Sequence, residues 1–481
     1  MNRVRDHAPV HIEQDEPPGD GLGEVLHRVV QVDRGAHVAI LNSISYTVSK
    51  FSRESSRTLY MVPERPRTLG LQHQINTEEN MTQKSPRLAI VGAGIGGLTL
   101  AIALKDQGWD VQLYEQADEL REVGAAVALS ANATRFYEDR FGLKEQLGAK
   151  AYEVQALIYR DGRDGRLIAE HRFDYKGKYG HPYVGIHRAD LQAILSGAVG
   201  MDSINLNKRL IDIDDSGSEA VLKFADGSSA AADLVIGADG AKSTVRRLLL
   251  GYDDAYYSGA SAFRGIVEPE QMPSMPDPDA IQFWMGPGRH CLHYPIGNGA
   301  HNFFLVERHP SPWPHKAWIA PTNDQEKLAG FGSWHPAIIE MVNAVPVSER
   351  WGLFHRPPLG RWSRGRVTLI GDAAHALVPH HGQGANQSIE DAIVLADQLL
   401  SNSDWDAARA EFERLRRGRT RKVQYASITA GDVYHLPDGP RADERNARLA
   451  DPDSFERHLG WIHSFIADEQ EPDEQSGGTW L

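Results

Sequence analysis

The first regular pattern of apolar and polar positions begins at Arg87. Residues 88–91 form a short unbroken apolar run, which is typical of a buried parallel strand. A glycine-rich turn and an apolar helical segment follow, and residues 111–114 make a second apolar run. This order predicts a strand–helix–strand unit, the building block of a parallel sheet.

The turn inside this unit reads Gly92-Ala93-Gly94-Ile95-Gly96-Gly97. Gly92 permits a tight turn, Gly94 lets the backbone approach a pyrophosphate, and Gly97 lets the helix lie close to the strand. Free N–H groups at the helix start favour phosphate, and an acidic residue at the end of the second strand can accept hydrogen bonds from a ribose. The spacing therefore predicts a dinucleotide site that includes Gly92, Gly94, Gly96, Gly97, Glu115 and Gln116.

Residues 88–104 also have a second interpretation. They are nearly free of polar side chains and follow Lys84 and Arg87, so they could form the core of a signal peptide or a short membrane span. Four glycines are unfavourable in so short a lipid-embedded helix, and no small-residue cleavage site follows. We favour the dinucleotide site, because the strand that ends at Glu115 comes at the expected distance.

Alternation farther along the chain predicts a second group of strands. Residues 154–159 and 167–173 alternate and are joined by a turn at 161–165, which predicts a β-hairpin. The region 251–360 is richer in Pro, Trp, His and Phe. Its apolar runs at 280–284, 291–295 and 302–306 predict a sheet that covers a small pocket. From Trp405 the chain is helical and charged, and the basic run 414–422 is predicted to be a solvated helix face.

Two further predicted strands end in a glycine and a carboxylate. Residues 233–236 lead into Gly237-Ala238-Asp239-Gly240, and residues 366–370 lead into Gly371-Asp372. Asp239 either contacts a ligand or only caps the next helix, and the residues alone favour neither. Asp372 can accept a hydrogen bond from a sugar-like hydroxyl, and the N–H groups near residues 384–386 can stabilise negative charge on a bound ring.

Composition limits the class of protein and of partner. The chain has 481 residues, 41% hydrophobic and 24% charged, which suits a globular protein of two or three domains. A net charge of −14 argues against a nucleic-acid or anionic-membrane binder. Cys291 is the only cysteine, which excludes an intrachain disulfide and favours a reducing cytoplasm. The 21 histidines show no metal-ligand spacing, so no metal is expected.

The two ends of the sequence differ from the rest. Residues 1–80 lack a sustained period and are predicted to be a disordered extension. Two alternatives stay open, because frequent Ser and Arg at 43–57 fit a transit peptide and because translation could start at Met81. The acidic tail, residues 468–481, is predicted to be frayed.

Three motifs occur in one order along the chain: the glycine turn at 92–97 with Glu115, the 237–240 segment with Ser243 and Arg246, and residues 371–375 followed by 382–385. Together they resemble the single-component FAD-dependent aromatic hydroxylases. The match is strongest with the salicylate hydroxylase-like branch, which includes 3-hydroxybenzoate 6-hydroxylase and 6-hydroxynicotinate 3-monooxygenase. The resemblance extends over residues 87–439. It implies an α/β fold, with an FAD/NAD(P)-binding Rossmann-like domain (86–153, 186–250 and 362–404), an inserted mixed β-sheet substrate domain (154–185 and 251–361) and a C-terminal helical segment (405–467).

The resemblance also implies a cofactor and a reaction. Beyond the glycine turn and Glu115, the implied FAD contacts are Val127, Arg188, Asp239, Gly240, Asp372, Gly382, Gly384, Ala385 and Asn386. NADH or NADPH is expected to reduce FAD, which then takes up O2 as a C4a-hydroperoxide and hydroxylates a small phenolic or hydroxy-heteroaromatic acid. The expected enzyme is a monomer or homodimer without a membrane or nucleic-acid partner.

The expected substrate site has fewer matches to support it. Ala260 and Phe263 stand where some relatives place a His and a Tyr. We therefore predict that catalysis uses the segment Pro379, His380 and His381, with one of the two imidazoles at the substrate oxygen. The predicted substrate contacts are Phe263, Arg264, Arg289 and His290, and Arg289 is expected to clamp a carboxylate. Simpler roles stay open, since the histidines could only pack and Arg289 could be exposed.

Two other functions also stay open. The first is an oxygenase of the same fold that acts on a larger ring system without a carboxylate. The second is a flavin-binding redox sensor without turnover.

Overall fold

The computed structural model describes residues 85–120, 126–172, 174–252, 255–309, 311–346 and 348–469. All of them belong to one compact unit, residues 78–481. The expectations for residues 1–80 and for most of the acidic tail lie outside the described residues. The division of the chain into an FAD-binding and a substrate domain stays a prediction, although two separate large sheets are present.

The first large sheet contains the predicted strand–helix–strand unit, which is confirmed. Its six strands follow the order β19-β20-β12-β1-β2-β8. Strand β1 pairs in parallel with β2 on one side and with β12 on the other, and β12 pairs in parallel with β20. The bounds are β1 Arg87–Val91, β2 Asp110–Tyr114, β8 Ile204–Asn205, β12 Leu234–Gly237, β19 Ser363–Arg364 and β20 Val367–Leu369. Because parallel strands end at one edge, all three predicted motifs lie along that edge.

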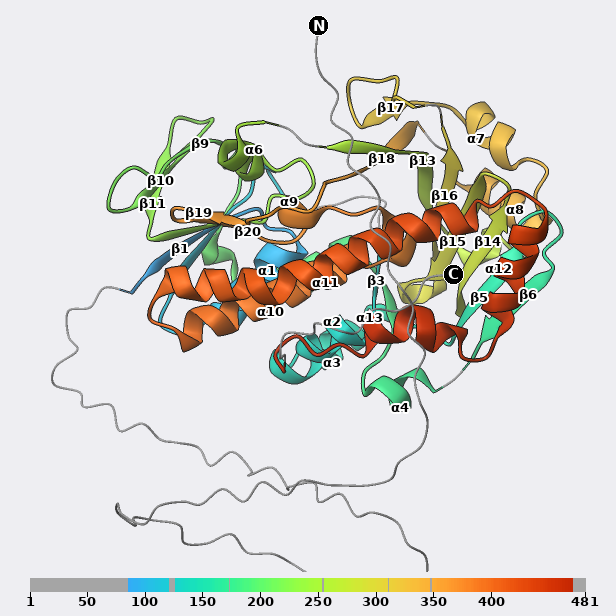
Figure 1. Ribbon diagram of the computed structural model, residues 1–481, viewed down its shortest axis with the longest axis horizontal. Coiled ribbons are helices and arrows are strands. Elements are labelled where there is room, and N and C mark those ends of the chain that lie inside the picture. The colour runs from blue at the N-terminus through green and yellow to red at the C-terminus, as the bar shows by residue number, and fades with distance from the viewer. Residues whose placement is uncertain are drawn as a thin grey trace, which may run out of the picture. The chain divides into compact units, whose positions relative to one another are not determined.

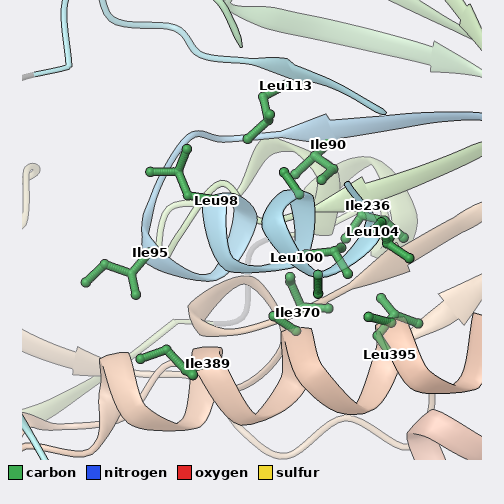
Figure 2. Close-up of a cluster of buried hydrophobic side chains, with 14 of the residues drawn as sticks. Ile90, Ile95, Leu98, Leu100, Leu104, Leu113, Ile236, Ile370, Ile389 and Leu395 are labelled. Atoms are coloured by element: carbon green, nitrogen blue, oxygen red, sulfur yellow. The ribbon is translucent and has the colours of Figure 1, made fainter. Parts of the chain in front are cut away.

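Helix α1 (Ile95–Leu104) lies between this sheet and helix α10 (Gly384–Ser401). Figure 2 shows Leu98 and Leu100 of α1 among Ile90, Ile236 and Ile370 of the surrounding elements. An apolar helix without a polar face is expected to be buried on all sides. The apolar stretch 88–104 is thus a strand and a core helix, and no helix within the described part of the chain is long and apolar enough to span a bilayer.

The second large sheet is mixed, as predicted. Its order is β17-β18-β13-β16-β15-β14-β5-β6, and only β14 and β5 pair in parallel within it. The predicted hairpin β5–β6 therefore joins strands that come more than a hundred positions later (Figure 1). The bounds are β5 Ala156–Asp161, β6 Leu167–His171, β13 Tyr256–Val267, β14 Ala280–Gly286, β15 Arg289–Pro295, β16 His301–Arg308, β17 Ile319–Pro321 and β18 Glu349–His355.

Smaller sheets and helices complete the described structure. One three-stranded sheet contains β3 (Ala126–Leu129), β7 (Val184–His187) and β4 (Ala151–Glu153), and the other contains β9 (Leu210–Asp214), β10 (Ala220–Phe224) and β11 (Ser229–Ala232). The remaining α-helices are α2 Ala131–Arg135, α3 Lys144–Gly148, α4 Tyr175–Tyr179, α5 Arg188–Val199, α6 Thr244–Leu250, α7 Asp324–Phe331, α8 Pro336–Ala344, α9 Asp372–His375, α11 Trp405–Tyr434, α12 Pro440–Ala450 and α13 Trp461–His463.

The long helix α11 packs along α10 and corrects one prediction (Figure 1). The basic run 414–422 is not a uniformly solvated face, because Arg416 and Arg419 are buried. Arg416 Nε lies 2.8 Å from Asp391 Oδ1, and its Nη1 lies 2.6 Å from Glu390 Oε2. Arg419 Nε lies 2.7 Å from the same Glu390 oxygen. The spacing of α11 alone could not reveal this, since the two carboxylates belong to α10.

Candidate active site

Two cavities meet at the edge where the parallel strands end. The larger, of ≈ 820 Å³, is lined by Glu115, Gln116 and Asp239 among others. The smaller, of ≈ 330 Å³, extends from the glycine turn to the second large sheet. Both are lined by Gly94, Arg188, Ala238 and Gly240, so they form one continuous groove. A long ligand with a nucleotide at one end and a ring at the other fits such a groove.

The glycines of the turn fall into two groups, those that pack against neighbouring backbone and one that faces the cavities. A Cβ on Gly92, whose φ is +106°, would lie 2.5 Å from the carbonyl oxygen of Ala238, and a Cβ on Gly97 would lie 2.2 Å from that of Gly92. Those two glycines are therefore required by neighbouring backbone. A Cβ on Gly94 would meet no atom within 4 Å, and Gly94 opens into both cavities. The room at Gly94, next to the amino end of α1, fits the pyrophosphate of a dinucleotide.

Glu115 lies at the end of β2 in the larger cavity. Its Oε2 accepts from Ala93 N at 2.9 Å and its Oε1 accepts from Ala117 N at 3.0 Å. These bonds fix the carboxylate, and each oxygen keeps a second lone pair for a ribose hydroxyl. Gln116 lines the same cavity.

Asp239 combines the two roles that the sequence left open. Its Oδ2 accepts from Thr244 N at 2.7 Å and from Val245 N at 3.1 Å, so it caps α6. Burial raises the pKa of this carboxyl, whereas the bonds from Ser243 and the helix backbone lower it. Asp239 also lines the larger cavity, and Gly240 lines both.

Asp372 follows β20 through a glycine whose backbone conformation other residues rarely adopt. Gly371 has φ +57°, and a Cβ there would lie 2.6 Å from Ser388 Oγ. Its N–H donates to Asp391 Oδ2 at 2.8 Å, which ties this turn to α10. Asp372 lines the smaller cavity, where burial raises its pKa against the opposing charges of His375 and Arg188.

Another wall of the smaller cavity comes from β3, the loop before α10 and the first turn of α10. Val127, Gly382, Gly384 and Ala385 all line the smaller cavity, as the resemblance implied. Asn386 lies behind this wall. Its amide donates to the carbonyl oxygens of Ala128 and Gly382, both at 2.9 Å, and accepts from Ser130 N at 3.0 Å. Asn386 thus joins β3 to the loop, and it is absent from the residues that line either described cavity.

The adjacent histidines point to different places. His381 lines the smaller cavity with Pro379, whereas His380 packs against His290 with ring centroids 5.3 Å apart. His290 Nδ1 lies 2.7 Å from His435 Nε2, and these three imidazoles form the histidine cluster. Burial lowers the pKa of His380 to about 4 and of His381 to about 3. Of the two predicted catalytic imidazoles, only His381 reaches the cavity, and it is neutral at pH 7.

The four predicted substrate contacts fall on both faces of the second sheet. Arg264 lines the cavity, but Phe263, the next residue along β13, lies on the other face among Trp284 and Phe331. Arg289 donates to the carbonyl of Gly330 and is absent from the cavity lining, and His290 belongs to the histidine cluster. Strand alternation explains the split, since successive side chains of one strand point to opposite faces.

The cavity also contains residues that the sequence did not single out. Its floor on the second sheet is made of Ile281, Phe283, Leu292, Tyr294, Asn302 and Phe304, and Tyr183 adds a second phenol. The alternation within 291–295 and 302–306 contained this signal. It became usable only when the register showed which face turns to the cavity.

Known proteins resemble this chain over the same region. A family model described as an FAD binding domain matches residues 86–294 and 344–425. The 3-amino-4-hydroxybenzoate 2-monooxygenase PtnB3 of Streptomyces platensis is 37% identical over 387 residues, which are 79% of this chain and 96% of that protein. The 6-hydroxynicotinate 3-monooxygenase of Bordetella bronchiseptica is 33% identical, over 72% of this chain and 91% of its own.

A solved structure agrees in fold. Klebsiella pneumoniae HpxO complexed with FAD and uric acid matches with a TM-score of 0.71 at 27% identity, covering 80% of this chain and 98% of that one. The groove at the glycine turn, the family match and the identity to named hydroxylases agree with one another and confirm the predicted resemblance. The chain belongs to the FAD-dependent aromatic hydroxylases, flavoprotein monooxygenases of the FAD-binding-domain family, and its cofactor is FAD.

Proposed function

We propose that the protein uses NAD(P)H and O2 to hydroxylate a small aromatic acid that also has a hydroxyl or amine on its ring. The observation that carries the proposal is the smaller cavity, which joins the predicted flavin loop to an apolar, aromatic floor with one arginine in it.

Arg264 is the residue that we assign to the substrate carboxylate. Of the described residues that line the smaller cavity, Arg188 and Arg264 have permanent positive charge. Arg188 borders both cavities and so lies on the cofactor side. Arg264 comes from the floor, where its guanidinium lies 3.7 Å from the ring centre of Trp351. Such stacking holds the planar group in place for a bidentate carboxylate contact.

We assign FAD to particular residues of the groove. The amino end of α1 at Gly94 would hold the pyrophosphate, Glu115 the adenosine ribose and Asp372 a hydroxyl of the ribityl chain. The flavin ring would lie against Val127, Gly382, Gly384 and Ala385. When bound and reduced by NAD(P)H, FAD would activate O2, which supplies the oxygen atom that is inserted in the ring.

His381 is assigned to orient the substrate oxygen. A neutral imidazole accepts a hydrogen bond from a phenol or an amine. Because burial lowers the pKa of His381 to about 3, it is a weak base. We therefore infer that His381 positions the ring substituent and does not take up its proton fully.

The proposal also covers the compartment, the oligomeric state and the partners of the enzyme. We place it in a reducing cytoplasm as a monomer or homodimer without a membrane or nucleic-acid partner. Its only cysteine, Cys291, is buried and free, and the net charge is −14.

The test uses the purified full chain with FAD bound. NADH and NADPH oxidation, O2 uptake and product formation are followed with 3-amino-4-hydroxybenzoate, 6-hydroxynicotinate, 3-hydroxybenzoate and salicylate. We expect one acid to stimulate oxidation with a matched yield of hydroxylated product. Arg264→Ala should raise the KM for that acid about 10- to 100-fold, whereas Arg289→Ala should leave it unchanged. Oxidation that ignores every acid, or that yields only hydrogen peroxide, would contradict the proposal.

A further inference from the structure

We propose that Asn302 and Tyr294 form a second polar subsite, which selects aromatic acids whose hydroxyl or amine lies para to the carboxylate. The inference rests on the proposed function, because it takes Arg264 as the carboxylate contact. It adds which isomer the cavity accepts and which residues recognise the group at the far end of the ring.

The register of the second sheet fixes the layout of the floor. Arg264 of β13 pairs with Phe304 of β16, and Phe304 pairs with Leu292 of β15. Two residues along the same strands, Asn302 pairs with Tyr294. The side chains of both rows line one cavity, and rows two residues apart lie about 7 Å from each other. The floor therefore has an apolar centre with polar groups in separate rows.

Arg264 leans away from the other polar groups. Its guanidinium stacks on Trp351 of β18, and β18 pairs with the edge of β13 opposite to β16. Asn302 and Tyr294 lie one and two strands away in the other direction and two residues along, next to Phe304 and Leu292 on the same strands. A ring on this apolar centre with its carboxylate at Arg264 presents its para position toward Asn302 and Tyr294. An ortho substituent stays next to the carboxylate and reaches neither.

The chemistry of the subsite suits an oxygen or amine. Among the described residues, no side chain or backbone group forms a hydrogen bond with the Asn302 amide, the Tyr294 hydroxyl or the Tyr183 hydroxyl, and all three residues line the cavity. Burial raises the pKa of Tyr294 and of Tyr183, so both phenols stay protonated and donate. Asn302 offers a donor and an acceptor. A hydroxyl, a phenolate or an amine can therefore be bound, whereas a bare ring edge would leave these groups without partners.

The experiment measures binding in addition to turnover. Purified enzyme with FAD is titrated with 4-hydroxybenzoate, 4-aminobenzoate, salicylate and benzoate, and the dissociation constants are read from the change in the flavin absorption spectrum. We expect the two para compounds to bind at least about tenfold more tightly than salicylate and benzoate. Tyr294→Phe and Asn302→Leu should each weaken binding of the para compounds about tenfold and leave that of benzoate unchanged. Tyr256→Phe is the matched control, because Tyr256 is exposed on β13 and far from the floor.

The possible outcomes distinguish the proposed subsite from the proposed function. Equal affinity for ortho and para isomers, or variants that weaken benzoate as much as 4-hydroxybenzoate, would overturn the subsite while an aromatic-acid site remained. If no aromatic acid changes the spectrum at millimolar concentration, the proposed function itself is wrong. Loss of yellow colour in a variant would show that the residue supports FAD, which also overturns its assignment to the substrate.

Discussion

Two buried polar clusters differ in how they accommodate ionisable groups in the interior. In the first, the ionic cluster, Glu390 and Asp391 of α10 meet Arg416 and Arg419 of α11. The second is the histidine cluster, which consists of His290, His380 and His435. The first cluster keeps full charges in the interior, and the second keeps its groups neutral.

The difference follows from the available partners. In the ionic cluster, Arg419 and Arg416 hold the pKa of Glu390 below its usual value, and His375 and Arg416 do the same for Asp391, even though burial acts the other way. Asp391 also accepts from Gly371 N, so the pairing fixes the turn that presents Asp372. The histidine cluster contains no carboxylate, and burial therefore pushes the pKa of each imidazole down. A buried ionisable group keeps its charge only where an opposite charge is supplied.

Removal of one charge from the ionic cluster should have the largest effect. Arg416→Met leaves two buried carboxylates partly unpaired, so we expect the free energy of unfolding to fall by about 3–5 kcal/mol. Urea denaturation followed by circular dichroism would measure it. Arg414→Met is the matched control on the same helix. Arg414 pairs with Glu411 near the surface, and its loss should lower stability by less than about 1 kcal/mol. Equal losses would mean that the buried charges are not coupled.

The two clusters should affect stability in different ranges of low pH. The pKa of His380 is about 4 in the folded protein, below its ordinary 6.5, so the unfolded chain takes up protons first as the pH falls. The free energy of unfolding should therefore keep its full value above pH 6.5. Between about pH 6.5 and 4 it should fall, by about 3 kcal/mol for this residue alone. The lowered pKa values of Glu390 and Asp391 act only below about pH 4.5. Denaturation curves from pH 8 to 4 would show the decline, and a flat profile down to pH 4.5 would contradict it.

A substitution inside the histidine cluster should change stability least. The variant should be less stable than the wild type at pH 8 and more stable near pH 5. His290→Phe removes the bond to His435, which should lower stability at pH 8 by about 1 kcal/mol. It also removes one imidazole that must stay neutral, so the slope of stability against pH should become shallower and the variant should exceed the wild type near pH 5. Parallel melting curves at pH 8 and 5 would test this. His315→Phe, at an exposed position outside the cluster, serves for comparison.

The same contrast explains what the sequence could predict. The sequence could predict that the glycine turn, Glu115 and Asp372 come to one groove, because each motif is local and parallel strands bring their ends to one edge. The burial of Arg416 could not be foreseen, since its partners belong to α10. The positions of Phe263 and Arg289 also escaped prediction, because one residue of register decides which face of a strand turns to the cavity.

The topology of the first sheet has a further consequence for biosynthesis. Strand β1 and the glycine turn leave the ribosome early, but β20, Asp372 and α10 come almost three hundred residues later. The groove cannot close until those late segments arrive, so a nascent or truncated chain that ends before Gly371 has the phosphate turn without the wall for the ring. Cofactor loading is then a late event in synthesis, and it reports that the whole chain up to α10 has folded.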